Sequence, residues 1–240
     1  MRILVLSDVH ANLPALDAVL ADAGEVDAVW HLGDVVGYGP DPDGVVDRLR
    51  AIGATGVRGN HDAAACGGSE IDWFNPDARG AMEWTRSTIS DATRTWLGAL
   101  PERTTLGGCE LVHGSPREPL WEYVTSSGIA RENLALLGAA IGLHGHTHVP
   151  VAWLDDGERI ELVRGRPGTE LRLDGRRALV NPGSVGQPRD GDPDAAYAIL
   201  DHEAGSVRWH RVPYDIAAVQ EAMRAAGLPA SLRARLSVGA

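Results

Sequence analysis

Apolar and amphipathic segments alternate along the first sixty residues. Residues 3–6 form an uninterrupted apolar run, which is typical of a strand buried on both faces. Asn12 is placed to cap the helix that follows, with Gly24 just past its end. The pattern predicts strands at 2–8, 27–34 and 55–60, with helices at 13–23 and 42–52. Strand–helix–strand repetition at this spacing implies right-handed crossovers and a mostly parallel sheet.

The pattern changes further along the chain. Residues 76–99 are helix-rich but contain a glycine and several β-branched residues, so we expect two helices there. Buried strands are predicted to end at 111–114 and 140–145, and a last helix is predicted at 215–226. After residue 149, alternating runs around DG and EAG turns predict hairpins at 151–163, 169–180 and 195–212. These hairpins favour antiparallel pairing in a second sheet. We expect an α/β fold in a single domain over residues 1–240, with a helical insertion around 63–103.

Polar side chains collect where these strands end. Asp8, Asp34 and Asn60 each follow a predicted strand, and such residues line the ligand crevice of a parallel sheet. Adding the segments VHG (112–114) and GHTH (145–148) gives a set that offers only oxygen and imidazole nitrogen donors. Crowded imidazoles repel one another once protonated, so HGHTH is either a chance run on a solvated strand or a cation site. The donor types suit borderline divalent ions such as Mn, Fe, Co, Ni or Zn without selecting among them.

Composition and net charge limit the kinds of molecule that the protein is expected to bind. The chain has 44% hydrophobic residues and a formal net charge of −11, which argues against stable nucleic-acid binding. A small phosphorylated substrate stays compatible, because a bound metal inverts the local potential. Cys66 and Cys109 lie far apart without a CxxC motif, so we expect free thiols in a reducing cytosol. No apolar stretch approaches the ~20 residues of a membrane helix, so we expect a cytoplasmic protein without a membrane partner.

The motifs DVH, GD, GNHD, the isolated His113 and GHTH follow one another between residues 8 and 148. In this order they resemble the calcineurin-like metallophosphoesterase superfamily. The segments DVVGYGPDP and NPGSVGQPR (181–189) are similar to those of its compact bacterial phosphodiesterase-type branch. The resemblance implies a sandwich of two mixed β-sheets flanked by helices, which would account for nearly all of the chain.

The resemblance also implies roles for the matched residues. Asp34 would bridge two divalent ions, with manganese the first expectation and Fe, Zn, Ni or Co as alternatives. The expected ligands of the first ion are Asp8, His10 and His148, and those of the second are Asn60, His113 and His146. His61 would protonate the leaving group, and Asp62 would fix its tautomer. His144 lies outside the motif and is expected to be a strand-end residue, with a supporting contact to a ligand as the alternative.

The expected reaction is hydrolysis of a phosphate ester by a hydroxide that bridges the two metals. A small phosphodiester or nucleotide is favoured as substrate. The same fold leaves open a phosphomonoesterase, a protein phosphatase, a dinucleoside polyphosphate hydrolase, a nuclease and a non-catalytic scaffold. The negative net charge argues against a nuclease. The presence of every expected metal-ligating residue and of the GNHD histidine argues against a non-catalytic scaffold.

Several residues outside the motifs stay open. Arg117 and Arg189 are candidate phosphate clamps, with solvated loop arginines as the alternative. Tyr38 is expected to pack within its loop rather than stack on a base. The glycines and proline of NPGSVG (181–186) allow a close backbone approach to the site. The four tryptophans between the motifs are expected to pack in the core or against caps, namely Trp73, Trp84, Trp96 and Trp121.

Overall fold

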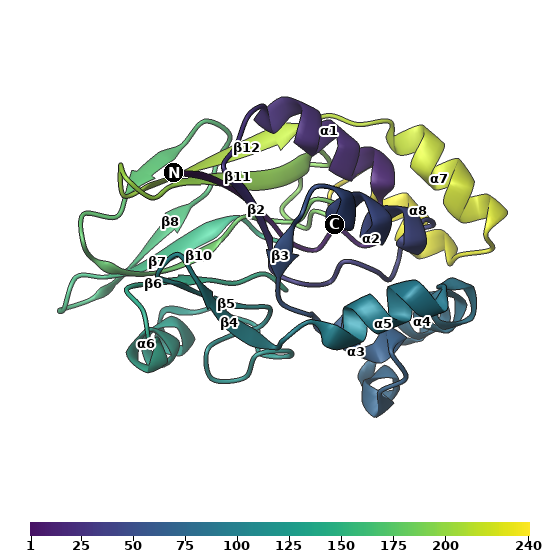
Figure 1. The fold of residues 1–240 in the computed structure, drawn as a ribbon, viewed down its shortest axis with the longest axis horizontal. Helices are drawn as coiled ribbons and strands as arrows, with labels where there is room; N and C mark the ends of the chain where they lie inside the picture. Colours follow the sequence, from purple (N-terminus) through teal and green to yellow (C-terminus); the bar gives the residue numbers. More distant parts are fainter.

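Strand β1 lies in the middle of the first of two six-stranded sheets (Figure 1). The computed structural model describes residues 1–240, apart from the side chain of Glu70. The first sheet has the order β3-β2-β1-β11-β12-β9, formed by Thr55–Gly56, Ala28–His31, Arg2–Leu6, Ala195–Asp201, Ser206–Val212 and Glu170–Arg172. The second has the order β4-β5-β6-β10-β7-β8, formed by Arg103–Leu106, Cys109–Val112, Ile141–Leu143, Arg177–Asn181, Val151–Asp155 and Ile160–Arg164. Both sheets contain parallel and antiparallel pairs, as expected.

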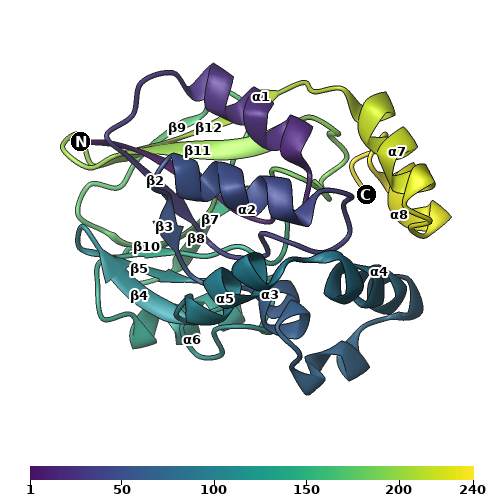
Figure 2. The same cartoon turned by 45° about the vertical axis from the view of Figure 1, so that its right-hand side comes forward.

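Helices cover the outer faces of the two sheets. In Figure 2, α1 and α2 lie over the first sheet, α6 lies under the second, and α7 and α8 lie at one end. The helices are α1 Leu13–Ala23, α2 Pro42–Ala51, α3 Asn60–Ala65, α4 Pro76–Thr88, α5 Asp91–Ala99, α6 Ser127–Leu136, α7 Ile216–Ala225 and α8 Ala230–Arg235, and η1 Ser69–Trp73 is a 3₁₀ helix. No helix in the described chain is long and apolar enough to cross a membrane.

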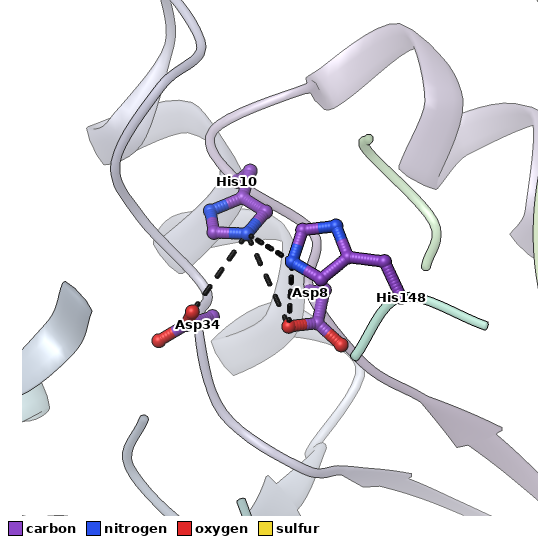
Figure 3. A group of neighbouring side chains, drawn as sticks. All are labelled: Asp8, His10, Asp34 and His148. Carbon is purple, nitrogen blue, oxygen red and sulfur yellow. Dashed lines mark hydrogen bonds and ion pairs between the residues drawn. The ribbon is translucent and has the colours of Figure 1, made fainter. Parts of the chain in front are cut away.

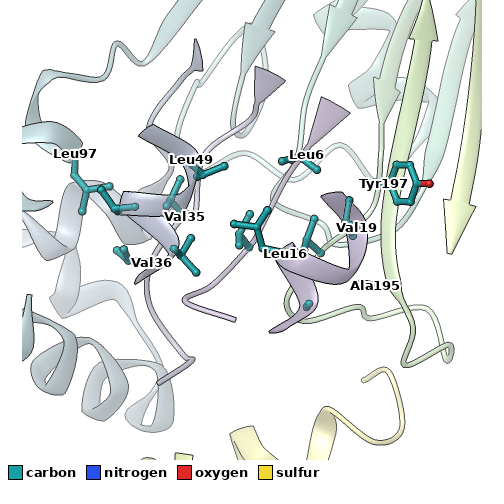
Figure 4. Packing of buried hydrophobic residues seen from close by; sticks show 14 of the residues in the cluster. Leu6, Leu16, Val19, Val35, Val36, Leu49, Leu97, Ala195 and Tyr197 are labelled. Atoms are coloured by element: carbon teal, nitrogen blue, oxygen red, sulfur yellow. The ribbon is translucent and has the colours of Figure 1, made fainter. Parts of the chain in front are cut away.

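The apolar run of β1 is buried on both of its faces. Leu4 and Leu6 belong to a cluster with residues of α1 and α2. Figure 4 shows Leu6 packed near Leu16 and Val19. Ile3 points the other way and packs between the two sheets. Full burial of each such side chain contributes about 1.5–3 kcal/mol, so this strand anchors both layers. The segment that follows β1 is therefore held rigidly in place.

Three expectations about strands need correction. Residues 169–180 do form a turn, with positive φ at Asp174 and Gly175, but its flanking strands β9 and β10 join different sheets and make no hairpin. The hairpins β7–β8 and β11–β12 are confirmed, yet they are divided between two mixed sheets and do not build a separate antiparallel one. Strand β3 is only two residues long, so Asn60 begins helix α3 and does not end a strand.

Residues 63–103 contain η1, α4 and α5, and the last two are the pair of helices expected there. Helix α7 confirms the expected helix at 215–226, whereas α6, α8 and the edge strand β4 were not foreseen. The assignment of the whole chain to one domain stays a prediction.

Candidate metal centre

All seven expected metal ligands are buried at one end of the two sheets. They come from the loops after β1, β2, β5 and β6 and from the first residue of α3. No ligand is more than 4% exposed, which is unusual for carboxylates and imidazoles without a compensating charge. The seven are Asp8, His10, Asp34, Asn60, His113, His146 and His148.

The backbone is strained at five of these positions. The structure contains eight non-glycine residues with positive φ, and five of them are expected ligands: Asp8, His10, Asp34, His146 and His148. Their φ values lie between 49° and 65°. A non-glycine residue in this left-handed region costs about 1–2 kcal/mol. Such strain persists where the surrounding structure over-determines a functional geometry.

The first group of ligands converges from three separate segments of the chain, the loops after β1, β2 and β6. Figure 3 shows the side chains of Asp8, His10, Asp34 and His148 pointing toward one another. The Nε2 atoms of His10 and His148 are 3.2 Å apart. Asp8 Oδ1 lies 3.2 Å from His148 Nε2, and Asp34 Oδ2 lies 3.7 Å from His10 Nε2. One central cation would be within reach of all four side chains.

The second group shares Asp34 with the first. Asp34 Oδ2 lies 3.3 Å from His113 Nε2, which in turn lies 3.1 Å from His146 Nδ1. Asn60 Oδ1 is also 3.1 Å from His113 Nε2. A single carboxylate oxygen therefore stands between two sets of imidazoles, which is the arrangement expected of a bridging ligand.

The hydrogen bonds of the four histidines leave one free nitrogen on each ring. His10 Nδ1 and His148 Nδ1 lie 3.2 Å and 2.5 Å from the carbonyl oxygens of Val36 and Gln187. Likewise, His113 Nδ1 lies 2.8 Å from Leu32 O, and His146 Nε2 lies 3.2 Å from Trp121 O. A carbonyl oxygen only accepts, so each of these nitrogens is the one that carries the proton.

In the neutral form of each ring, the other nitrogen presents a lone pair to the centre of the cluster. Two such lone pairs facing each other at 3.1–3.2 Å repel unless a cation or a proton lies between them. Asp8 Oδ1 is buried and has no hydrogen-bond partner among the described residues. Histidines held by backbone carbonyls around unsatisfied carboxylate oxygens form the usual surroundings of a bound metal. The residues present therefore fit divalent cations.

The charges in the cluster support the same conclusion. Burial lowers the pKa values of His10, His146 and His148 well below the ordinary value, so these rings are neutral ligands at pH 7. Burial also raises the pKa of Asp8 to about 7. His113 differs, because Asp34 outweighs the effect of burial and raises the pKa of His113 to about 9. In the metal-free protein, a proton on His113 thus balances the negative charge of Asp34, which a bound cation would otherwise balance.

His61 lies beside the cluster without belonging to either group. Its backbone N–H donates to Asp34 Oδ1 at 2.8 Å, and its ring lines the cavity over the cluster. Gly59 allows this approach, since a Cβ there would lie 2.1 Å from Asp34 Oδ1. Burial lowers the pKa of His61 to about 4, so the ring is neutral at pH 7 in the absence of a ligand.

Asp62 does not contact the His61 ring as expected. Its carboxylate accepts hydrogen bonds from the backbone N–H groups of Val35, Val36 and Gly59 at 2.9–3.1 Å. His61 Nδ1 has no hydrogen-bond partner among the described residues. The expectation that Asp62 fixes the tautomer of His61 is therefore wrong. Asp62 instead ties the start of α3 to the loop that carries Asp34.

A cavity of about 230 Å³ opens over the cluster. Arg189 lines this cavity together with Tyr38, and their guanidinium and ring lie 5.8 Å apart. Arg117 is not part of the lining and forms ion pairs with Glu122 and Glu132. Of the two candidate phosphate clamps, only Arg189 is in position.

Two tryptophans have a different role from the expected core packing. Trp73 is 72% exposed at the cavity, and Trp121 lines the same cavity. Phe74 and Tyr123 also line it and were not singled out from the sequence. Nothing in their local pattern marks them, because they lie in segments without regular periodicity.

The remaining sequence expectations concern the support of the site. Asn12 Oδ1 accepts from Ala15 N and caps α1, as predicted. The NPGSVG segment approaches the site through its backbone, since Gly186 N donates to Asp8 O at 3.0 Å. His144 is buried, but neither of its ring nitrogens has a hydrogen-bond partner among the described residues, so the supporting contact is absent.

A family model of the calcineurin-like phosphoesterase superfamily domain matches residues 1–205. The chain belongs to this superfamily. The uncharacterized protein MJ0912 of Methanocaldococcus jannaschii is 35% identical over 245 residues, which cover 99% of this chain and 98% of that protein. Phosphodiesterase YfcE of Escherichia coli K12 is 30% identical over 220 residues, 86% of this chain and 91% of YfcE.

The fold of the family is also found in solved structures. A metallophosphoesterase from Sphaerobacter thermophilus is 46% identical and has a TM-score of 0.92, with 100% of this chain and 99% of that chain covered. Family membership and the buried aspartate and histidine cluster together support a hydrolase of phosphate esters that binds divalent metal.

Proposed function

We propose that this protein uses two divalent cations to hydrolyse a small phosphate ester, with a phosphodiester as the favoured substrate. One observation carries the proposal: four buried imidazoles turn their free nitrogens toward Asp34, a carboxylate that belongs to both groups of ligands. In this assignment, Asp8, His10 and His148 hold one cation, and Asn60, His113 and His146 hold the other. Bound cations would lower the pKa of water and neutralise charge on the phosphate.

The protein's own residues divide the remaining work. Arg189 is placed to bind a phosphate oxygen at the cavity wall. The His61 ring faces the same cavity and is assigned to the leaving oxygen, to which a neutral imidazole donates a hydrogen bond. The negative charge of a bound phosphate favours protonation of His61 and so opposes the effect of burial on its pKa. Asp62 acts as a positioning residue, because it fixes the start of α3 relative to Asp34.

Phosphodiester hydrolysis is favoured by the similarity to YfcE of Escherichia coli, which is named a phosphodiesterase. The size of the cavity, about 230 Å³, suits a small molecule better than a folded phosphoprotein. Manganese is our first choice of metal, since oxygen and imidazole donors accept it without requiring thiolate. We further propose a cytoplasmic location with no nucleic-acid or membrane partner, in keeping with the net charge of −11 and the free cysteines Cys66 and Cys109.

Metal analysis combined with two variants tests the proposal. The metal-stripped protein is reconstituted with Mn²⁺, and bound metal and hydrolysis of bis(p-nitrophenyl) phosphate and p-nitrophenyl phosphate are measured. We expect two metals per chain, faster hydrolysis of the diester, and loss of both metals in Asp34→Ala. His61→Ala should keep both metals while kcat falls by ~10²–10⁴-fold. His202→Ala, at an exposed histidine, is the matched control and should change neither.

Two results would contradict the proposal. Full metal occupancy without hydrolysis of either ester would point to a non-catalytic scaffold. Loss of metal in His61→Ala would show that the roles of ligand and proton donor are wrongly divided.

A further inference from the structure

The cavity over the cluster is unusually rich in aromatic side chains. Aromatic residues make up 5% of the chain, yet five of the thirteen residues that line this cavity are aromatic. The five, which we name the aromatic wall, are Tyr38, Trp73, Phe74, Trp121 and Tyr123. They come from the loop after β2, from η1 and the residue after it, and from the loop between β5 and α6. Three separate segments of the chain thus place aromatic rings around one small space.

The aromatic wall is continuous with the metal centre. Phe74 stacks on His61 with ring centroids 4.6 Å apart and an interplanar angle of 29°. Tyr123 stacks on His146 at 4.0 Å and 21°. A ligand that reached the cluster would therefore contact aromatic surface at once.

Trp73 is the member whose surface is least used within the protein. It is 72% exposed, and it meets Trp121 edge to face with centroids 5.1 Å apart. Trp121 in turn meets Phe74 edge to face at 5.6 Å. Phe74 already stacks one face on His61, whereas the largely exposed ring of Trp73 leaves most of its surface available to a planar ligand. Aromatic side chains commonly line small-molecule sites, and planar bases stack on them.

The same cavity provides a place for an anion. Arg189 is the only arginine among the lining residues, and its Nε is buried without a hydrogen-bond partner among the described residues. Its Nη2 lies 3.1 Å from Gln187 Oε1, so part of the guanidinium is already oriented. A phosphate bound in the cavity would give this guanidinium an anionic acceptor.

We infer that the substrate is a phosphate ester with a planar aromatic substituent, such as a nucleobase, which binds on Trp73 and its neighbours Phe74 and Trp121. Arg189 binds the phosphate through its charge, and the aromatic wall binds the planar substituent by stacking. This inference rests on the proposed function for the identity of the ester. It narrows the favoured substrates to those with an aromatic substituent and adds the residues that select them.

Binding of two ligands that differ only in the base tests the inference. Adenosine 5′-monophosphate and ribose 5-phosphate are titrated calorimetrically into the protein reconstituted with Mn²⁺. Stacking of a base on aromatic side chains contributes about 1–3 kcal/mol, so the nucleotide should bind about 5-fold more tightly or better. Trp73→Ala should remove most of this preference, and Trp73→Phe should retain most of it.

Two further variants separate the base from the phosphate. Arg189→Gln should weaken both ligands by the same factor, because both carry the phosphate. Leu136→Ala, at a leucine that is 53% exposed on α6 and outside the cavity, is the control and should leave both affinities unchanged.

The outcomes distinguish this inference from the proposed function. Equal affinity for the two ligands, or equal weakening of both in Trp73→Ala, would overturn the aromatic selectivity even in an active phosphodiesterase. A clear preference for the nucleotide in a protein that hydrolyses no ester would uphold the binding site and overturn the proposed reaction.

Discussion

Replacing Gly37 with alanine is expected to inactivate the protein without removing its metals. Gly37 has φ +89° and lies against the ring of His61, so an added Cβ would be 2.4 Å from His61 Nδ1. An ordinary van der Waals contact needs about 1 Å more. The ring has little room to yield, because Tyr38, Phe74 and His10 lie around it with centroids 4.4–4.9 Å away.

The magnitude follows from this displacement. A catalytic group misplaced by about 1 Å costs roughly 10²-fold in rate, so kcat should fall by that order. Positive φ adds a stability cost of about 1 kcal/mol for alanine. Gly24→Ala is the matched control, since Gly24 also has positive φ (+64°) but a Cβ there would meet nothing within 4 Å. It should show a backbone cost of its own without the loss of activity.

A double-mutant cycle isolates the contact with His61. Hydrolysis of bis(p-nitrophenyl) phosphate and metal content are measured for Gly37→Ala, His61→Ala and the combination. Because His61→Ala removes the ring, adding Gly37→Ala to it should cost almost nothing further in kcat. Additive losses in the cycle, or a Gly37→Ala variant as active as Gly24→Ala, would refute the assignment of His61.

The metal centre and the buried polar groups give three more predictions. Saturating Mn²⁺ should stabilise the stripped protein in thermal unfolding, by about 2.7 kcal/mol at 100 times Kd, and Asp34→Ala should abolish the gain; a gain of the same size in that variant would exclude this site. Asp62→Asn should cost about 2–3 kcal/mol in urea unfolding, because its amide group would face the backbone N–H of Gly59 or Val35; an unchanged midpoint would disprove this. Burial lowers the pKa of His31 to about 4 in the folded protein, whereas the same side chain in the unfolded chain has a pKa of about 6.5. As pH falls between these two values, the unfolded chain binds the proton and the folded protein does not. The free energy of unfolding should therefore fall by about 3 kcal/mol over this range. His31→Leu should flatten this part of the pH profile, and a slope equal to that of the parent would show that His31 does not cause it.

The ends of the strands could be predicted because a strand that is buried on both faces appears in the sequence as an uninterrupted apolar run. The apolar run before Asp8 and the polar residue after it are both visible in the sequence, and the structure brings Asp8 and Asp34 together. The sequence places Asn60 at a strand end because a helix as short as α3, with six residues, has no recognisable apolar periodicity. It still reaches the cluster, since the first turn of that helix begins beside Asp34.

Long-range pairing and irregular loops could not be predicted from the local pattern. The turn at Asp174 and Gly175 looks like a hairpin turn and has the backbone of one, but pairing partners elsewhere in the chain draw β9 and β10 into different sheets. Trp73 has no periodic neighbours that would show whether it faces the core or solvent. The role of Asp62 was misjudged because adjacency in sequence says nothing about which backbone amides a carboxylate meets in the fold.

The position of β1 between β2 and β11 has a consequence for biosynthesis. Ile3 pairs with Ala28 on one side but with Leu200 on the other, and the backbone of Asp8 is held by Gly186. Asp8 and His10, the first ligands to be synthesised, therefore reach their final positions only after segments made much later have folded against β1. The nascent protein would bind metal weakly until Gly186 and β11 have been made and have folded against β1, so the proposed metal binding would follow the folding of both sheets.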